Sequence, residues 1–175
     1  MLDRKVQWRI IEWDPVDHAA YGIIGGSNLL FKYDPHHGPE GAVTPLASMA
    51  APGVRDGDPM NLPYATLAMA ISQKERKVYY ITVMAGDFDY GAVTKDVMGS
   101  SFLVSYDLKS GRREDLGVLR TTDGRTTSGM GGAKVDQNGR LWFVGAFSES
   151  DPRYQAGRGR RPYSMGLGCY DPFRK

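Results

Sequence analysis

Short apolar stretches alternate with turn-forming residues along the 175-residue chain. Three times, an acidic or polar turn leads into an aromatic-aliphatic stretch, and a second apolar stretch then ends in Tyr-Asp, at residues 33–34, 106–107 and 170–171. Aromatic and β-branched residues between Gly, Pro, Asp and Asn are typical of β-strands, whereas no stretch has a sustained helical period with caps. We therefore predict an all-β chain with an internal repeat.

The repeat predicts up to four strands in each copy, which we call a to d in chain order. Strand a is expected at Trp8–Trp13, Ala65–Ile71 and Gly131–Val135. Strand b holds the aromatic residues Tyr21, Tyr79 and Trp142, and strand c ends at Tyr33, Tyr106 and Tyr170. Strand d is expected at Ala42–Leu46 and Arg113–Leu119, and the third copy lacks it because the chain ends at Lys175.

The spacing of the copies predicts a β-propeller. The strand-b aromatics are 58 and then 63 residues apart, and strand b precedes the strand-c tyrosine by 12 residues in the first copy but by 27 and 28 in the others. Without the extra residues between b and c, one copy has about 48 residues, close to one four-stranded blade. We predict a single partial β-propeller domain over residues 1–175, with blades at about 6–49, 64–119 and 129–175.

Composition narrows the classes of partner. With 41% hydrophobic and 24% charged residues the chain has the composition of a soluble globular domain. A net charge of +2 gives no field that would recruit nucleic acid or an anionic membrane, so neither is expected as a partner. The single cysteine, Cys169, excludes an intrachain disulfide. We find no secretory signal and no apolar run long enough to span a bilayer, and the compartment stays open.

The pattern of a turn, an aromatic strand and a strand ending in Tyr-Asp-Pro or Tyr-Asp-Leu resembles bacterial propeller repeats outside the WD class. Such repeats occur in virginiamycin-B-lyase-like, regucalcin-like and oligogalacturonate-lyase-like proteins. The likeness covers nearly the whole chain and implies an architecture rather than an activity. Lyases of the oligogalacturonate type resemble metal-assisted enzymes with histidine-rich central sites. No residue here matches that constellation, so no catalytic residue is carried over.

Two complete blades and three strands of another make an incomplete ring, since propellers close with four to eight blades. Three interpretations are open. The chain is the C-terminal part of a larger propeller, which the absent last strand favours, or it completes itself by self-association, for example as two chains in a six-bladed ring. The third interpretation is an open partial propeller.

The long connections predict which end of the blades carries function. Because strands alternate in direction, b–c and d–a connections emerge at one end and a–b and c–d connections at the other. The long connections, at 50–63, 85–100, 119–130 and 147–163, are all of the first kind. Long loops on a rigid scaffold often carry binding residues. The ligand-binding candidates in these connections are Asp87, Asp89, Tyr90, Arg125, Tyr154, Arg158, Arg160 and Arg161.

These candidates suggest an anionic ligand such as an acidic saccharide. Arginine forks bind carboxylate, sulfate or phosphate groups with two hydrogen bonds, and neighbouring tyrosines can stack on a sugar. The simpler interpretation of the Arg158–Arg161 segment is a solvated loop, and we favour it. The carboxylates of Asp87 and Asp89 are ligands that calcium accepts, but the glycine and distal glutamate of a full calcium loop are missing. No cofactor or other metal is therefore expected.

The three histidines, His18, His36 and His37, fall in a–b and c–d turns and should lie at the opposite end. Our leading hypothesis is a ligand- or protein-binding scaffold with no assignable activity. The alternative is a propeller-type lyase or hydrolase acting on an acidic sugar or lactone, with Tyr90 or Tyr154 as acid or base. Such a tyrosine needs a strongly lowered pKa. A third hypothesis is a purely structural fragment.

Overall fold

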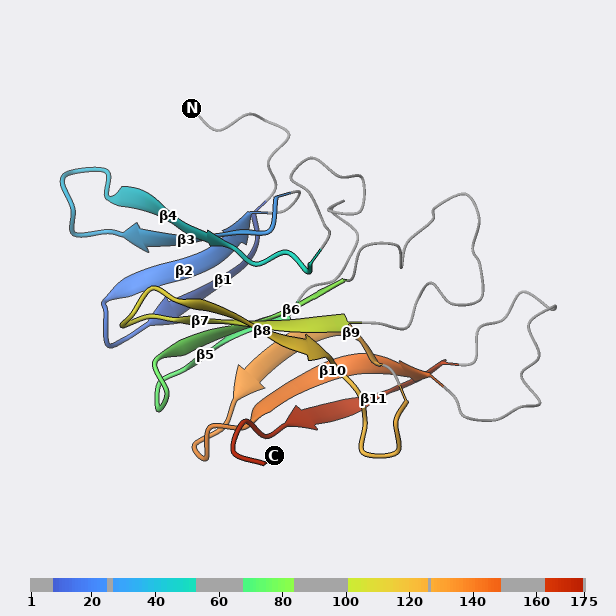
Figure 1. Cartoon of the computed structure of the whole chain (residues 1–175). Helices are drawn as coiled ribbons and strands as arrows, with labels where there is room; N and C mark the ends of the chain where they lie inside the picture. Colours follow the sequence, from blue (N-terminus) through green and yellow to red (C-terminus); the bar gives the residue numbers. More distant parts are fainter. Residues whose placement is uncertain are drawn as a thin grey trace.

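The computed structural model describes residues 8–24, 27–52, 68–83, 101–125, 127–148 and 163–174. Within these ranges the chain forms eleven strands and no helix (Figure 1). The strands make three antiparallel sheets of four, four and three strands, and in each sheet every strand pairs with its neighbour in the sequence. The prediction of an all-β chain built from small antiparallel sheets is confirmed. The described sheets do not close into a ring.

The first sheet contains β1 (Trp8–Asp14), β2 (Ala19–Ile24), β3 (Leu29–Asp34) and β4 (Ala42–Ser48). The middle sheet contains β5 (Ala68–Ser72), β6 (Lys77–Val83), β7 (Ser101–Asp107) and β8 (Arg113–Val118). The third sheet contains β9 (Thr127–Val135), β10 (Leu141–Ser148) and β11 (Tyr163–Tyr170).

Each expected strand corresponds to a described one, although several ends differ by one or two residues. The start of the first strand differs more in two of the sheets. The first strand of the third sheet begins at Thr127 rather than at Gly131. Residues 65–67 of the expected second strand a lie outside the described residues, and β5 begins at Ala68.

The middle sheet is buried on both of its faces. Consecutive residues of a strand point to opposite faces, so neighbouring residues of one strand contact different sheets. In β6, Tyr80 packs into a cluster with residues of the first sheet, whereas Tyr79 and Ile81 pack against the third sheet. In Figure 1 the middle sheet accordingly lies between the other two. The two clusters form the core, and each joins one pair of neighbouring sheets.

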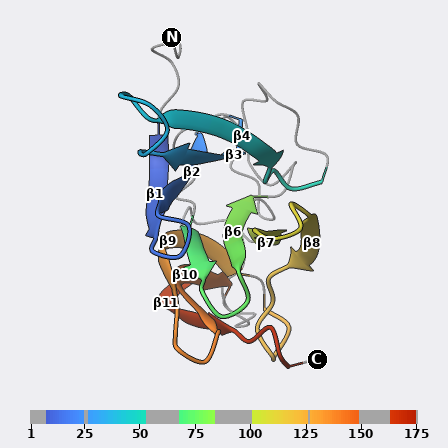
Figure 2. The same cartoon turned by 90° about the vertical axis from the view of Figure 1, so that its left-hand side faces the viewer.

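The first strands of the three sheets lie together. β5 contacts β1 on one side and β9 on the other. In Figure 2, β1 and β9 lie on the left of the molecule, whereas β4 crosses the top and β8 lies on the right. The first strands therefore lie close together, and the three sheets diverge from one another towards their last strands.

Aspartates fix the turns that follow the third strands. The Asp34 carboxylate accepts a hydrogen bond from the His36 amide at 2.9 Å. Asp107 accepts from the amides of Lys109 and Ser110, at 2.9 and 2.7 Å. Asp171 accepts from the Phe173 amide at 3.0 Å. These are Asx-type turns, in which a short side chain replaces a backbone acceptor.

Candidate functional site

The connections between strands leave the sheets at two opposite ends. The a–b and c–d connections are short turns, such as 15–18 and 35–41, and we call their end the short-turn end. β6 ends at Val83 and β7 begins at Ser101, while β10 ends at Ser148 and β11 begins at Tyr163. By the antiparallel register these strand ends lie at the opposite end, where β4 and β8 also end. We call it the long-connection end.

Of the predicted ligand-binding residues, only Arg125 lies within the described part of the chain. Its guanidinium forms an ion pair with Asp123, at 2.8 Å between Nε and Oδ2, in the turn between β8 and β9. A hydrogen bond from the Thr121 hydroxyl, and then the contact with Arg125, hold the pKa of the Asp123 carboxyl below its usual value. Asp87, Asp89, Tyr90, Tyr154, Arg158, Arg160 and Arg161 lie outside the described residues, so the calcium prediction and the arginine loop stay predictions.

The histidines lie at the short-turn end, as predicted. His18 occupies the turn between β1 and β2 with a φ of 49°, and His36 and His37 lie in the turn between β3 and β4. In the part of the chain that the structure describes, no three His, Cys, Asp or Glu side chains come together in a way that could hold a metal ion.

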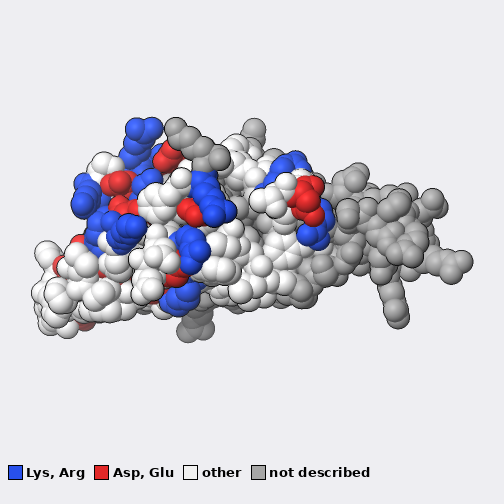
Figure 3. Space-filling model, turned by 90° about the horizontal axis from the view of Figure 1, so that it is seen from below, with Lys and Arg blue, Asp and Glu red and all other residues white. Residues whose placement is uncertain are grey.

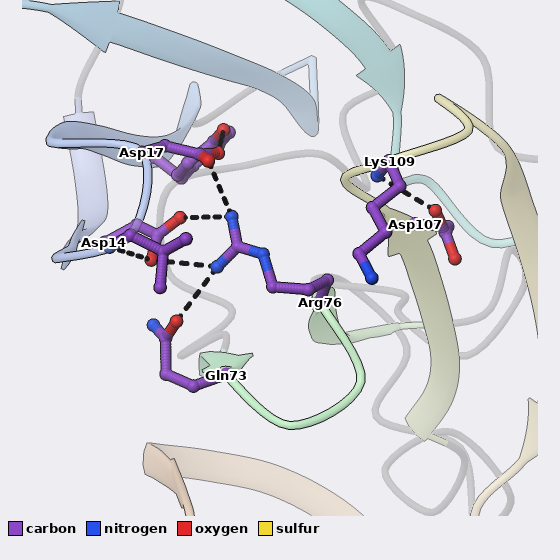
Figure 4. A network of polar contacts seen from close by, with 8 residues as sticks. Asp14, Asp17, Gln73, Arg76, Asp107 and Lys109 are labelled. Atoms are coloured by element: carbon purple, nitrogen blue, oxygen red, sulfur yellow. Dashed lines mark hydrogen bonds and ion pairs between the residues drawn. The ribbon is translucent and has the colours of Figure 1, made fainter.

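A largely buried polar network joins the first sheet to the middle sheet through Arg76 (Figure 4). The Arg76 guanidinium binds both oxygens of Asp14, at 3.0 and 2.7 Å, and one oxygen of Asp17 at 2.8 Å. It also donates to the Gln73 side chain at 2.9 Å. The Asp14 side chain is fully buried, whereas Asp17 is partly exposed. The network therefore ties the β5–β6 turn to the β1–β2 turn.

The charges in this network are matched. Burial by itself raises the pKa of Asp14, but the hydrogen bonds from Arg76 and from the Val16 amide outweigh it and lower the pKa to about 2. The hydrogen bond to Asp14 in turn raises the pKa of Arg76. Asp14 is thus a permanent carboxylate with a bidentate partner, which is a structural rather than a catalytic arrangement.

The second strand of each sheet carries an aromatic side chain that donates a hydrogen bond to a carboxylate near the preceding turn. The three donor–acceptor pairs are Tyr21–Asp17 at 2.5 Å, Tyr79–Glu75 at 2.8 Å and Trp142–Asp136 at 2.9 Å. Burial, followed by the neighbouring carboxylate, raises the pKa of Tyr21 and Tyr79, and burial also raises the pKa of Tyr170. None of these three tyrosines can serve as a general base near neutral pH.

Glu12 makes a second set of polar contacts between the sheets, at the place where their first strands meet. Glu12 of β1 accepts a hydrogen bond from the Ile71 amide of β5 at 3.1 Å. The other oxygen of the same carboxylate pairs with the ammonium group of Lys134 in β9. One side chain thus links the first strands of all three sheets.

The described part of the chain has a polar hollow at the short-turn end of the middle sheet. Its volume is about 270 Å³, and its lining mixes both signs of charge, with Lys77, Ser105, Asp107, Ser110, Arg112 and Glu114. On the face seen in Figure 3, basic side chains lie among acidic ones, and the described residues form no patch of a single sign. Neither feature favours one class of charged ligand.

No protein-family model and no curated protein matches this sequence. The described residues include no helix long and apolar enough to cross a membrane. Function is therefore inferred from the sequence and the geometry of this chain. Sequence reasoning missed the Arg76 network and the Glu12–Lys134 pair, because both join residues far apart in the chain.

Proposed function

We propose that the three sheets are consecutive blades of a β-propeller, and that the chain is a binding scaffold whose ligand face is the long-connection end. The proposal rests on one observation: the first strands lie together, with β5 in contact with both β1 and β9, and the sheets diverge from there. In a propeller each blade packs face to face on the next, and the first strands surround the axis. The middle sheet, buried on both faces, fits the position of a blade inside such a ring.

The choice of ligand face rests on the direction of the strands. β6, β10 and the last strands of the first two sheets all end at the same side, and the turns at the other side are short and fixed by their own aspartates. Binding residues are usually carried by longer connections on a rigid scaffold. Arg125, which lies at this end, is one-third exposed, and its ion pair with Asp123 leaves other guanidinium donors for a ligand.

The ligand class proposed is an acidic saccharide, because the sequence places Arg125, Arg158, Arg160 and Arg161 in connections of this end. The test compares an oligogalacturonate with its neutral methyl ester in thermal unfolding and titration calorimetry. We expect only the acidic oligomer to raise Tm. At a concentration 100-fold above Kd, binding adds about 2.7 kcal/mol to the free energy of unfolding.

The variant that tests the site replaces Arg158, Arg160 and Arg161 together with alanine, and it should abolish the effect of the acidic oligomer. The matched control is Arg112→Ala, an exposed arginine at the short-turn end, which should bind like wild type. The proposal fails if the acidic oligomer leaves Tm unchanged. It also fails if the triple variant binds as well as the control.

A further inference from the structure

Each sheet packs on the next one in the same orientation, so the two faces of a sheet can be distinguished. We call the face that carries the second-strand aromatic (Tyr21, Tyr79, Trp142) the leading face, and the face that carries the third-strand tyrosine (Tyr33, Tyr106, Tyr170) the trailing face. The leading face of the first sheet packs on the trailing face of the middle sheet, with Tyr21 and Tyr106 in one cluster. The leading face of the middle sheet packs on the trailing face of the third, where the Tyr79 and Tyr170 rings lie 6.2 Å apart.

This order leaves one face of each kind without a partner sheet in the described part of the chain. The trailing face of the first sheet carries Ile11 and Trp13 of β1, which are 55% and 49% exposed, and Val43 of β4 beside Tyr33. Alternation and register place these side chains together, since Trp13 pairs with Ala20 and Ala20 pairs with Tyr33.

The leading face of the third sheet also exposes apolar side chains, beside the charged Lys134 at its edge. Val144 of β10 and Leu167 of β11 are cross-strand partners and are 41% and 65% exposed. Trp142 and Cys169 form the next pair on the same face. Two apolar sheet faces of this kind on one molecule are unusual unless something covers them.

We propose that a second copy of this chain covers both faces, with the leading face of each third sheet packed on the trailing face of the other copy's first sheet. The two exposed faces are the same two kinds that already pack together twice within the chain, so the contact repeats an interface that the molecule makes itself. Such a head-to-tail contact is heterologous and forms a ring where the rotation closes. Two copies supply six sheets, within the four to eight of a closed propeller. The inference rests on the proposed propeller arrangement.

The first test is the mass of the wild-type chain by sedimentation velocity and light scattering over a range of concentrations. We expect a species of twice the 19.3 kDa of one chain. Leu167→Asp and Ile11→Asp should each give single chains, because each places a charge in both interfaces of the ring. Val16→Asp is the matched control, since Val16 is an equally exposed apolar residue in the β1–β2 turn outside both faces, and it should stay dimeric.

The decisive test mixes the two monomeric variants. The Leu167→Asp chain retains an intact first-sheet face, and the Ile11→Asp chain retains an intact third-sheet face, so the mixture should form a mixed dimer through one good interface. A symmetric contact that pairs like with like would give no such recovery. Labelling of Cys169, the one cysteine in the sequence, with a maleimide gives a second readout, because dimerisation should slow it.

The inference is overturned if wild type stays a single chain at high micromolar concentration, or if the variants do not recover on mixing while circular dichroism shows both folded. If the chain stays monomeric and binds the acidic saccharide, the proposed function stands and only this inference is refuted. If the chain dimerises but does not bind the saccharide, this inference stands and the proposed ligand is refuted.

Discussion

At the scale of single residues, Arg76 joins the first two sheets through ion pairs with two aspartates. It neutralises Asp14, whose side chain is fully buried, and it holds Asp17 at the rim of the same interface. A buried ion pair adds little stability over well-packed apolar residues, but the removal of one partner leaves the other charge without compensation. The network therefore specifies how the two sheets pack on each other rather than adding much stability.

We expect Arg76→Met to lower the free energy of unfolding at pH 7 by about 3 kcal/mol, because Asp14 is then a buried charge without a partner. The effect should depend on pH. The pKa of Asp14 in the folded protein, about 2, is below its ordinary value of 3.8, so the stabilisation is fully present above that value and is lost as the pH falls towards 2. In the variant the buried carboxyl takes up a proton at higher pH. The gap between the two proteins should therefore narrow as the pH falls.

Urea unfolding at pH 7, 5 and 3, followed by circular dichroism, measures this gap. Arg112→Met is the control at an exposed arginine and should change stability by less than about 0.5 kcal/mol. The double variant Asp14→Leu with Arg76→Met removes both charges and should recover most of the loss. A gap that stays constant from pH 7 to pH 3 would contradict the assignment of the effect to the Asp14 carboxylate.

At the scale of elements, strand order and turns could be read from the sequence, because both depend on local residue types. The Tyr-Asp endings predicted the third strands, and Asp34 and Asp107 fix the turns that follow. Contacts between sheets could not be read in this way. Glu12 and Lys134 are 122 residues apart, and no local pattern pairs a glutamate in one first strand with a lysine in another.

For the candidate site too, the sequence predicted where residues lie but not which contacts they make. The sequence placed the histidines at the short-turn end through the alternation of strand direction, and the structure confirms that end. It also identified Arg125, but its ion pair with Asp123 depends on the conformation of a turn that residue types alone do not specify. The other predicted ligand residues stay predictions.

A close packing contact within the first sheet gives a prediction at this scale. Gly22 of β2 lies beneath the buried ring of Phe31, and an added Cβ would come 2.5 Å from Phe31 Cζ and 2.9 Å from the Ile10 carbonyl oxygen. We expect Gly22→Ala to cost about 1–3 kcal/mol of stability, since the buried ring or the backbone must shift to admit the methyl group.

Gly132→Ala in β9 is the matched control, because a Cβ there would meet no atom within 4 Å. Replacement of glycine where the backbone tolerates it reduces the entropy of the unfolded chain, so this variant should be neutral or slightly more stable. Thermal unfolding of the two variants in parallel compares them directly. Equal Tm values for both would mean that Phe31 does not pack on Gly22 in solution.

At the scale of the whole molecule, stability should be unevenly distributed among the three sheets. The middle sheet is covered on both faces, with Tyr79 and Tyr80 buried on opposite sides, whereas the first and third sheets each expose one apolar face. Local opening costs more free energy where more apolar surface must be exposed. A single chain should therefore open first at its two outer sheets.

Hydrogen exchange followed by mass spectrometry tests this gradient. In dilute solution, amides of β6 and β7 should exchange most slowly, and those of β10 and β11 should exchange faster because Leu167 and Val144 face solvent. Raising the protein concentration should slow exchange in β1, β10 and β11 and change little in the middle sheet, since only the outer faces gain a partner. If β11 were as protected as β7 in the dilute chain, burial would not set the order of opening. If concentration had no effect on β1, the exposed face that contains Ile11 and Trp13 would have no second copy packed on it.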